Sequence, residues 1–87
     1  MHDTDNFRYI GANGIVDLTR PENIILDLLI KNKGNIVTYK ELIDTVYKGQ
    51  DDYYYRKCIN SHICRINKKL KNELNIKNRI EIGYMLM

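Results

Sequence analysis

The chain has 87 residues, a net charge of +3 and 44% hydrophobic residues, which suits one small domain with little room for an enclosed catalytic pocket. No run approaches the roughly 18 apolar residues of a membrane span, and the polar N-terminus does not resemble a signal peptide, so we expect a cytoplasmic protein. Cys58 and Cys64 lack metal-ligand spacing and are expected to be reduced thiols, so neither a metal nor another cofactor is expected.

Charge is distributed unevenly along the chain. Residues 1–55 hold six Lys/Arg and nine Asp/Glu, a net −3, whereas residues 56–87 hold eight and two, a net +6. A concentrated positive region favours a polyanion through counterion release. Nucleic acid fits this region better than an acidic membrane does, because the apolar side of the basic helix is needed for a core.

The first elements are a predicted hairpin and a capped helix. Apolar runs at 7–10 and 15–18 flank a Gly-Ala-Asn-Gly segment, which is typical of a β-hairpin. Thr19 and Glu22, with a proline between them, match a capping box and predict a helix that ends at Gly34. This helix is expected to bury Ile24, Ile25, Leu28 and Leu29.

The same signals follow a second time. Residues 35–37 predict one short strand, and Thr38 with Glu41 predicts a second capping box and a helix that ends at Gly49. Its inward residues are expected to be Leu42, Ile43, Val46 and Tyr47. A short acidic loop leads to the tyrosines at 53–55, which we expect to pack between the second and third helices, with stacking on nucleic acid as the lesser alternative.

The third helix, expected over residues 57–74, has two different surfaces. Apolar residues recur every third or fourth position and form one stripe: Ile59, Ile63, Ile66, Leu70 and Leu74. At about 100° per residue, the opposite side collects Lys57, Ser61, Cys64, Arg65 and Lys68. Cations and small polar groups on an outward face suit a DNA major groove, although the pattern alone also fits a core helix with a solvated basic side.

Residues 76–86 predict a terminal hairpin, because apolar residues alternate there, and the pattern favours a turn at Asn78-Arg79. A helix-turn-helix pair followed by a hairpin indicates an α+β winged helix-turn-helix with three helices. We expect one domain over residues 1–87, with residues 1–6 disordered.

Four segments carry a resemblance to a known family. Residues 18–22, 32–42, 62–70 and 83–86 resemble the DNA-binding effector domain of OmpR/PhoB-type transcription regulators. Each motif is weak by itself, but their order and spacing are specific. The resemblance covers residues 7–87.

The resemblance implies that helix 57–74 enters the major groove while hairpin 76–86 acts as a wing in the adjacent minor groove. It implies base contacts by Ser61 and Arg65 and a phosphate contact by Lys57, and these residues fall on the outward face described above. An arginine fork can bind guanine O6 and N7 together, whereas a lysine is a point charge suited to phosphate. Further phosphate contacts are expected from Lys68, Thr38 and Tyr39, and wing contacts from Lys77 and Arg79.

The implied partner is double-stranded DNA. Relatives contact RNA polymerase through the segment that corresponds to loop 48–52, and they bind direct repeats as head-to-tail pairs, so a homodimer on DNA is also expected. No small-molecule substrate and no enzymatic activity are expected, because the most plausible catalytic imidazole, His62, flanks the apolar stripe. The chain is either an effector domain cut from a longer regulator or a small stand-alone regulator.

The chain departs from the family pattern at several positions. Cys64 and Asn67 occupy places that are basic in the family, and Ile80-Glu81 stands where the family has an arginine-glycine pair. There is room for about two strands before Thr19, where the family has four. These departures motivate an alternative, a winged-helix protein-interaction module without DNA binding. Salt distinguishes the two, because the affinity of a DNA binder falls steeply with salt and that of an apolar interface does not.

Overall fold

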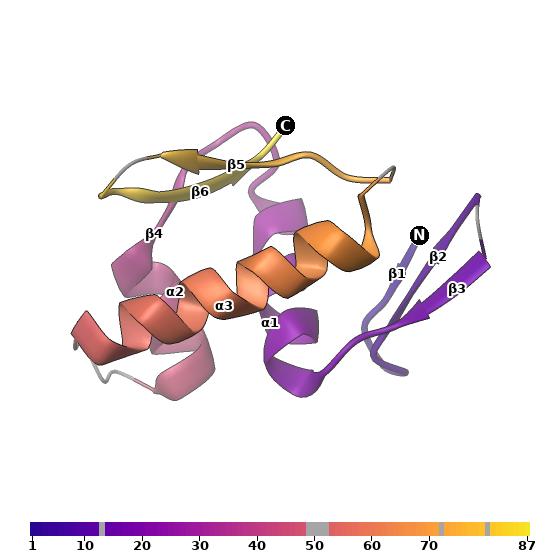
Figure 1. The fold of residues 1–87 in the computed structure, drawn as a ribbon, viewed down its shortest axis with the longest axis horizontal. Coiled ribbons are helices and arrows are strands. Elements are labelled where there is room, and N and C mark those ends of the chain that lie inside the picture. Colours follow the sequence, from indigo (N-terminus) through magenta and orange to yellow (C-terminus); the bar gives the residue numbers. More distant parts are fainter. Residues whose placement is uncertain (13, 49–52, 72, 80) are drawn as a thin grey trace.

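The computed structural model describes residues 1–12, 14–48, 53–71, 73–79 and 81–87, with only the backbone of Tyr53. The long helix α3 crosses α1, with one sheet along its length and a second sheet near its C-terminal end (Figure 1). The elements in chain order are β1 (His2–Asp3), β2 (Arg8–Gly11), β3 (Gly14–Asp17), α1 (Arg20–Lys31), β4 (Val37–Thr38), α2 (Tyr39–Tyr47), α3 (Tyr53–Lys69), β5 (Ile76–Arg79) and β6 (Gly83–Leu86).

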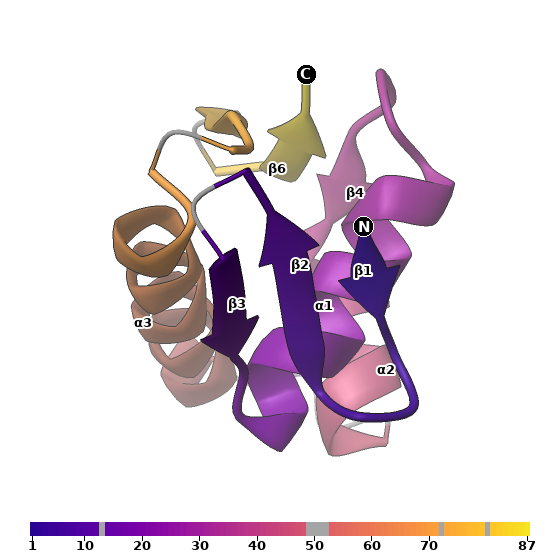
Figure 2. The ribbon, with the colours of Figure 1, turned by 90° about the vertical axis from the view of Figure 1, so that its right-hand side faces the viewer.

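The N-terminal sheet has three antiparallel strands in the order β1-β2-β3, whereas two were expected (Figure 2). His2 pairs with Tyr9 and Asp3 with Arg8, so residues 2–3 form a strand rather than a disordered tail. The His2 ring also hydrogen-bonds Asn23 of α1, with 2.7 Å between Nε2 and Oδ1. The sequence could not show this strand, because two residues carry no periodicity and their partners are distant in the chain.

Helix α1 begins as predicted and ends earlier. The Glu22 amide donates to Thr19 Oγ1 and the Thr19 amide donates to Glu22 Oε1, which confirms the capping box. The helix ends at Lys31 with Asn32 as its C-cap, and the Asn32 side chain donates to the Leu28 carbonyl. Gly34 adopts a φ of 86° in the turn that follows, where a left-handed backbone suits glycine.

The buried face of α1 is rotated slightly from the prediction. Ile25 and Leu29 are fully buried as expected, and so is Leu26, which was not predicted. Ile24 and Leu28 are only half-buried. The helix contacts α2, α3 and β6, so its buried arc is wider than a single stripe.

Helix α2 begins at its predicted cap, where Thr38 Oγ1 accepts a hydrogen bond from the Glu41 amide at 3.2 Å. The reciprocal bond from the Thr38 amide to the Glu41 side chain is absent among the described residues, so the predicted capping box is only half formed. Leu42 and Ile43 are fully buried, as predicted. The helix ends at Tyr47, before the predicted end at Gly49, and its C-cap is Lys48 in a left-handed conformation. Gly49 and the expected loop 50–52 lie outside the described residues.

Helix α3 confirms the predicted faces, but it runs over Tyr53–Lys69 where residues 57–74 were expected. The helix stops at Lys69, and the Leu74 amide bonds the Leu70 carbonyl in the turn toward β5. The stripe residues of the helix, Ile59, Ile63 and Ile66, are buried, and so is Leu70 directly after its end. Leu74 lies outside the helix and packs against the core half-buried, so a continuous apolar period did not mean a continuous helix.

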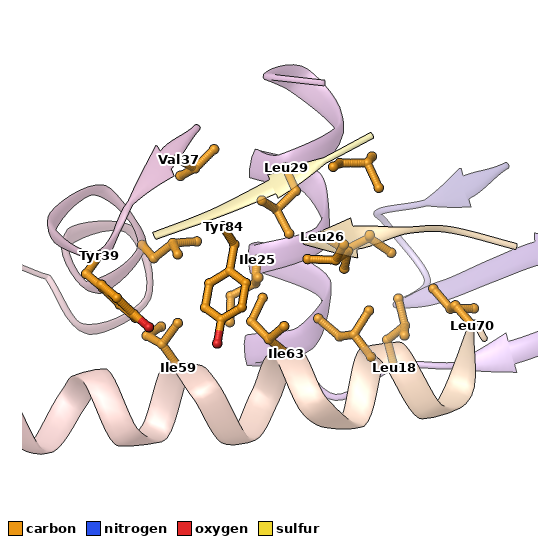
Figure 3. Packing of buried hydrophobic residues seen from close by; sticks show 14 of the residues in the cluster. Leu18, Ile25, Leu26, Leu29, Val37, Tyr39, Ile59, Ile63, Leu70 and Tyr84 are labelled. Atoms are coloured by element: carbon orange, nitrogen blue, oxygen red, sulfur yellow. The ribbon is translucent and has the colours of Figure 1, made fainter. Parts of the chain in front are cut away.

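The core lies where the stripe of α3 meets α1 and the sheet β4-β6-β5 (Figure 3). Ile59 and Ile63 of α3 point toward Ile25 of α1 and the ring of Tyr84 on β6. Each fully buried side chain of this size contributes about 1.5–3 kcal/mol. Burial of the stripe therefore sets the rotation of α3 about its axis.

The wing turn differs from the prediction. Asn78 and Arg79 lie in β5, paired with Tyr84 and Gly83, and the turn follows them, with the Ile82 amide bonded to the Arg79 carbonyl. All four residues of β6 are buried, because β6 lies between β4 and β5. The alternating pattern of apolar residues predicted one exposed face for this strand and so did not reveal that β6 is central. Ile80 lies outside the described residues.

Gly83 allows the close approach of β6 to β4. A Cβ atom at this position would lie 2.0 Å from the Val37 carbonyl oxygen, and that oxygen belongs to the backbone of the paired strand. We expect Gly83→Ala to lower the free energy of unfolding by more than about 2 kcal/mol, because backbone must move to admit the methyl group.

The matched control is Gly11→Ala, measured beside it by urea denaturation. Its Cβ would meet the end of the Glu73 side chain, which can rotate away, so we expect a loss below about 1 kcal/mol. Equal losses for the two variants would contradict the assigned role of Gly83.

Candidate nucleic-acid interface

The outward face of α3 is exposed along its whole length. All members of the face derived from helical geometry are exposed: Lys57, Ser61, Cys64, Arg65 and Lys68. The opposite face of the same helix is buried in the core. The structure therefore holds these side chains together on one rigid surface.

Two hollows separate α3 from the wing sheet. One, of about 530 Å³, lies between α3 and β5 and is lined by Asn60, Ile63, Cys64, Asn67, Lys68, Lys71, Ile76, Asn78 and Tyr84. The other, of about 440 Å³, lies near the start of α3 and is lined by Tyr39, Arg56, Lys57, Asn60 and Glu81. Asn60 and Arg56 were not among the predicted site residues, and Asn60 lines both hollows.

The predicted wing cations lie apart from these hollows. Ile76 and Asn78 line the hollow beside α3, whereas the intervening residues Lys77 and Arg79 do not. Successive residues of a strand point to opposite faces, so Lys77 and Arg79 project from the other side of β5, where both are exposed. The structure does not bring them together with the cations of α3.

Two predicted phosphate-contact residues at the start of α2 differ in exposure: Thr38 reaches the surface, whereas Tyr39 is buried. Thr38 is half-buried and its oxygen caps α2, so its hydroxyl proton remains available to an acceptor. Tyr39 is only 7% exposed, and its hydroxyl donates to Asn60 Oδ1 at 2.8 Å. The expected phosphate contact by Tyr39 is therefore not supported, because its hydroxyl proton is already donated to Asn60.

Comparison with known proteins identifies this arrangement. The sequence matches the family described as "Transcriptional regulatory protein, C terminal" over residues 12–86. The chain belongs to this family. Its members resemble the OmpR/PhoB-type effector domains named above, so the chain is a winged-helix DNA-binding domain of transcription regulators.

Individual relatives agree with the family assignment. A Staphylococcus epidermidis protein named as an epidermin response regulator is 32% identical over 87 residues, and the match covers 98% of this chain and 42% of the relative. The chain thus spans less than half the length of that protein. The DNA-binding domain of Bacillus subtilis CssR has a TM-score of 0.86 at 25% identity, with 100% of this chain and 98% of that chain covered.

A third structure is similar in fold alone. It is the DNA-binding domain of the response regulator AdeR, solved in complex with an intercistronic region. The TM-score is 0.80 at 22% identity, with 99% of this chain and 90% of that chain covered. The fold of this chain is thus shared with both solved DNA-binding domains.

Glu81 departs from the family pattern at the tip of the wing. Its φ is 63°, a left-handed conformation that glycine adopts freely and that costs other residues about 1–2 kcal/mol. A glycine at this place, which the resemblance implies, would fit that backbone. In this chain an exposed carboxylate instead borders the hollow that contains Arg56 and Lys57.

A buried ion pair anchors the end of α3 in this family member. Lys69 Nζ lies 2.6 Å from Glu22 Oε1 and donates to the Asp17 carbonyl at 3.2 Å. Glu22 has no exposed surface, which its capping role did not predict. Burial favours the neutral acid, but hydrogen bonds from Lys69 and the Thr19 amide outweigh it and hold the pKa of Glu22 below its ordinary value.

His62 is held against the second helix by a hydrogen bond to Tyr47. It is half-buried, and its Nε2 lies 2.9 Å from the Tyr47 hydroxyl. Burial and the nearby charge of Arg65 lower the pKa of His62 below its ordinary 6.5, and they outweigh the opposing effect of Glu22. The neutral form of the ring is therefore favoured at pH 7. The Tyr55 ring packs on Tyr47 at 4.6 Å, which confirms the predicted packing for that tyrosine, whereas Tyr54 is exposed.

Two searches of the described residues gave negative results. Within these residues, no helix combines the length and apolarity of a membrane span. Over the same part of the chain, no three His, Cys, Asp or Glu side chains lie close enough to hold a metal ion.

The ion pair predicts a pH-dependent loss in Lys69→Met. Without the ammonium group, the Glu22 carboxylate is buried with less compensation, so we expect the free energy of unfolding to fall by about 2–3 kcal/mol at pH 7. This is less than the ~3–5 kcal/mol expected for a fully buried pair, because Lys69 is partly exposed. The lowered pKa of Glu22 means that the wild-type stabilisation is present above pH 4.5 and is lost as the pH falls through the folded pKa.

The difference in stability between wild type and Lys69→Met should therefore shrink in acid. Urea denaturation at pH 7 and pH 3 measures it, with Lys71→Met as the control for loss of an exposed lysine nearby. A difference that stays constant with pH would show that the loss arises from the lysine stem and not from its pairing with Glu22.

Proposed function

We propose that this domain binds double-stranded DNA sequence-specifically, with α3 in the major groove and the β5–β6 hairpin as the wing. The observation that carries this proposal is the exposed polar face of α3 opposite its buried stripe. The major groove is about 12 Å wide and admits one helix, which contacts bases only through side chains on its exposed side. The net charge of +6 over residues 56–87 supports the proposal by favouring a polyanion.

The chemistry of the outward face assigns roles to its residues. Arg65 and Ser61 contact base edges, because a guanidinium fork and a small hydroxyl can both hydrogen-bond in the groove. Lys57 and Lys68 contact phosphates, and the Thr38 hydroxyl donates to a phosphate at the start of α2. Lys77 and Arg79, on the outer side of β5, contact the backbone or minor groove beside the wing.

We propose two further partners, which the family resemblance supports. Loop 48–52 contacts RNA polymerase, and two copies bind direct repeats head to tail. Of that loop only Lys48, which is exposed, lies among the described residues. A DNA-binding role also supports the cytoplasm as the compartment.

Substitution of Arg65 and Lys57 separates the two kinds of contact. Arg65→Ala should weaken binding to the preferred site by about 1–3 kcal/mol and relax the preference at one base pair. Lys57→Ala should weaken binding to all sequences nearly equally and reduce the salt slope by about one. Fluorescence anisotropy on a selected site and on random duplex measures both.

The wild-type titration with salt tests the proposed function itself. A steep fall of log K with log salt is expected from several neutralised phosphates. The second candidate, a protein-interaction module, is favoured by exposed apolar residues of the N-terminal sheet, Ile10 and Ile15, and of the turn before β2, Phe7. It predicts no DNA binding even at low salt, and that result would refute the DNA-binding proposal.

Glu81 should lower DNA affinity by its charge and lower stability by its backbone conformation. Glu81→Gly removes both effects, so we expect tighter DNA binding and a gain of about 1 kcal/mol in the free energy of unfolding. Glu81→Gln is the matched control, because it removes the charge and keeps the left-handed residue: affinity should rise without the gain in stability. Unchanged affinity in both variants would place the wing tip away from phosphate.

A further inference from the structure

Asn60 is held by two tyrosine hydroxyls from two other elements. Its Oδ1 accepts a hydrogen bond from the Tyr39 hydroxyl at 2.8 Å and another from the Tyr84 hydroxyl. Tyr39 is the first residue of α2 and Tyr84 lies in β6, so three elements meet at one carboxamide. The two tyrosine rings pack edge to face with centroids 5.9 Å apart, and both side chains are almost fully buried.

The two hydrogen bonds fix the direction of the Asn60 amide. A carbonyl oxygen has two lone pairs, and both are used here. The amide nitrogen points away from the tyrosines, and among the described residues it has no hydrogen-bond partner. Burial raises the pKa of Tyr84 well above its ordinary value, with a further contribution from Tyr39, so the Tyr84 hydroxyl remains a donor across the usable pH range.

Asn60 also has the right position to meet DNA. The residue is exposed, lies one turn from Lys57 and Cys64 on α3, and lines both hollows between α3 and the wing. Asparagine usually reads adenine by accepting from N6 with its oxygen while donating to N7 with its nitrogen. That mode is blocked here because the oxygen is occupied, so only the donating end remains.

We propose that Asn60 is a further specificity-determining residue, which donates its amide NH₂ to an acceptor on a base edge, with Tyr39 and Tyr84 as the positioning residues that impose this polarity. The acceptor is a purine N7, guanine O6 or thymine O4. The cytosine N4 amino group is itself a donor and is disfavoured at that place. This inference rests on the proposed function, since it requires α3 to lie in the major groove.

Asn60→Asp reverses the polarity with little change in shape. The aspartate can still accept from both tyrosine hydroxyls, but its free oxygen accepts where the wild type donates. We expect selection from a random duplex library to show a switch at one position, toward cytosine, with about a tenfold change in relative preference. Overall affinity should fall as well, because a negative charge is added near phosphate.

Asn67→Asp is the matched control. It adds the same charge on the same helix and in the same hollow, at a residue for which the structure shows no bond to the two tyrosines. It should lower affinity without the switch toward cytosine at the Asn60 position. A switch that also occurs in this control would overturn the assignment to Asn60.

The double variant Tyr39→Phe/Tyr84→Phe tests the positioning role. Loss of both hydroxyls frees the Asn60 oxygen, so the amide can bind adenine through both of its ends, and adenine should gain about tenfold at that position. Circular dichroism and urea denaturation verify that the variant is folded. A folded double variant with the wild-type base preference would refute the role of the tyrosines.

The outcomes separate this inference from the proposed function. Wild-type protein that binds no duplex refutes the proposed function and this inference with it. Wild-type binding with an unchanged base preference in Asn60→Asp, and an equal loss on all sequences, would assign Asn60 to phosphate and overturn only this inference.

Discussion

Burial of the apolar stripe on α3 is the constraint on which the rest of the structure depends. Ile59, Ile63 and Ile66 must face α1 and the wing sheet, because exposing them would cost several kcal/mol in a domain with a thin stability margin. That requirement fixes the rotation of the helix about its own axis. It therefore decides which side chains point outward, and the DNA-binding face is the geometric complement of the core face.

The second constraint is the position of β6 between β4 and β5. Gly83 lets this strand approach Val37 closely, and Tyr84 then reaches across the core to the flank of α3. The wing is thus attached to the recognition helix through side chains as well as through the chain connection. Such attachment matters for recognition, because a base-reading group is selective only when its orientation is held by its surroundings.

Two acidic residues add electrostatic effects to this fold. The buried pair of Glu22 and Lys69 joins the end of α3 to the start of α1, whereas Glu81 places a negative charge near Arg56 and Lys57. Glu22 is buried with its Oε1 paired to Lys69 while its Oε2 has no partner among the described residues, whereas Glu81 is exposed beside cations that would face a polyanion. The same kind of residue thus has opposite consequences, according to burial and partner.

Sequence alone determined the features that depend on neighbours along the chain: both helix N-caps, the buried and exposed faces of α3, and the order of elements in a winged helix. Periodicity and capping report local geometry, so Ser61 and Arg65 could be placed outward from the sequence. Tertiary structure decided the end of α3, the strand at His2–Asp3, the central position of β6 and the two tyrosines on Asn60. Those features arise from pairing and packing between distant segments, and no local pattern of residues records which distant partner a strand or a hydroxyl group will meet.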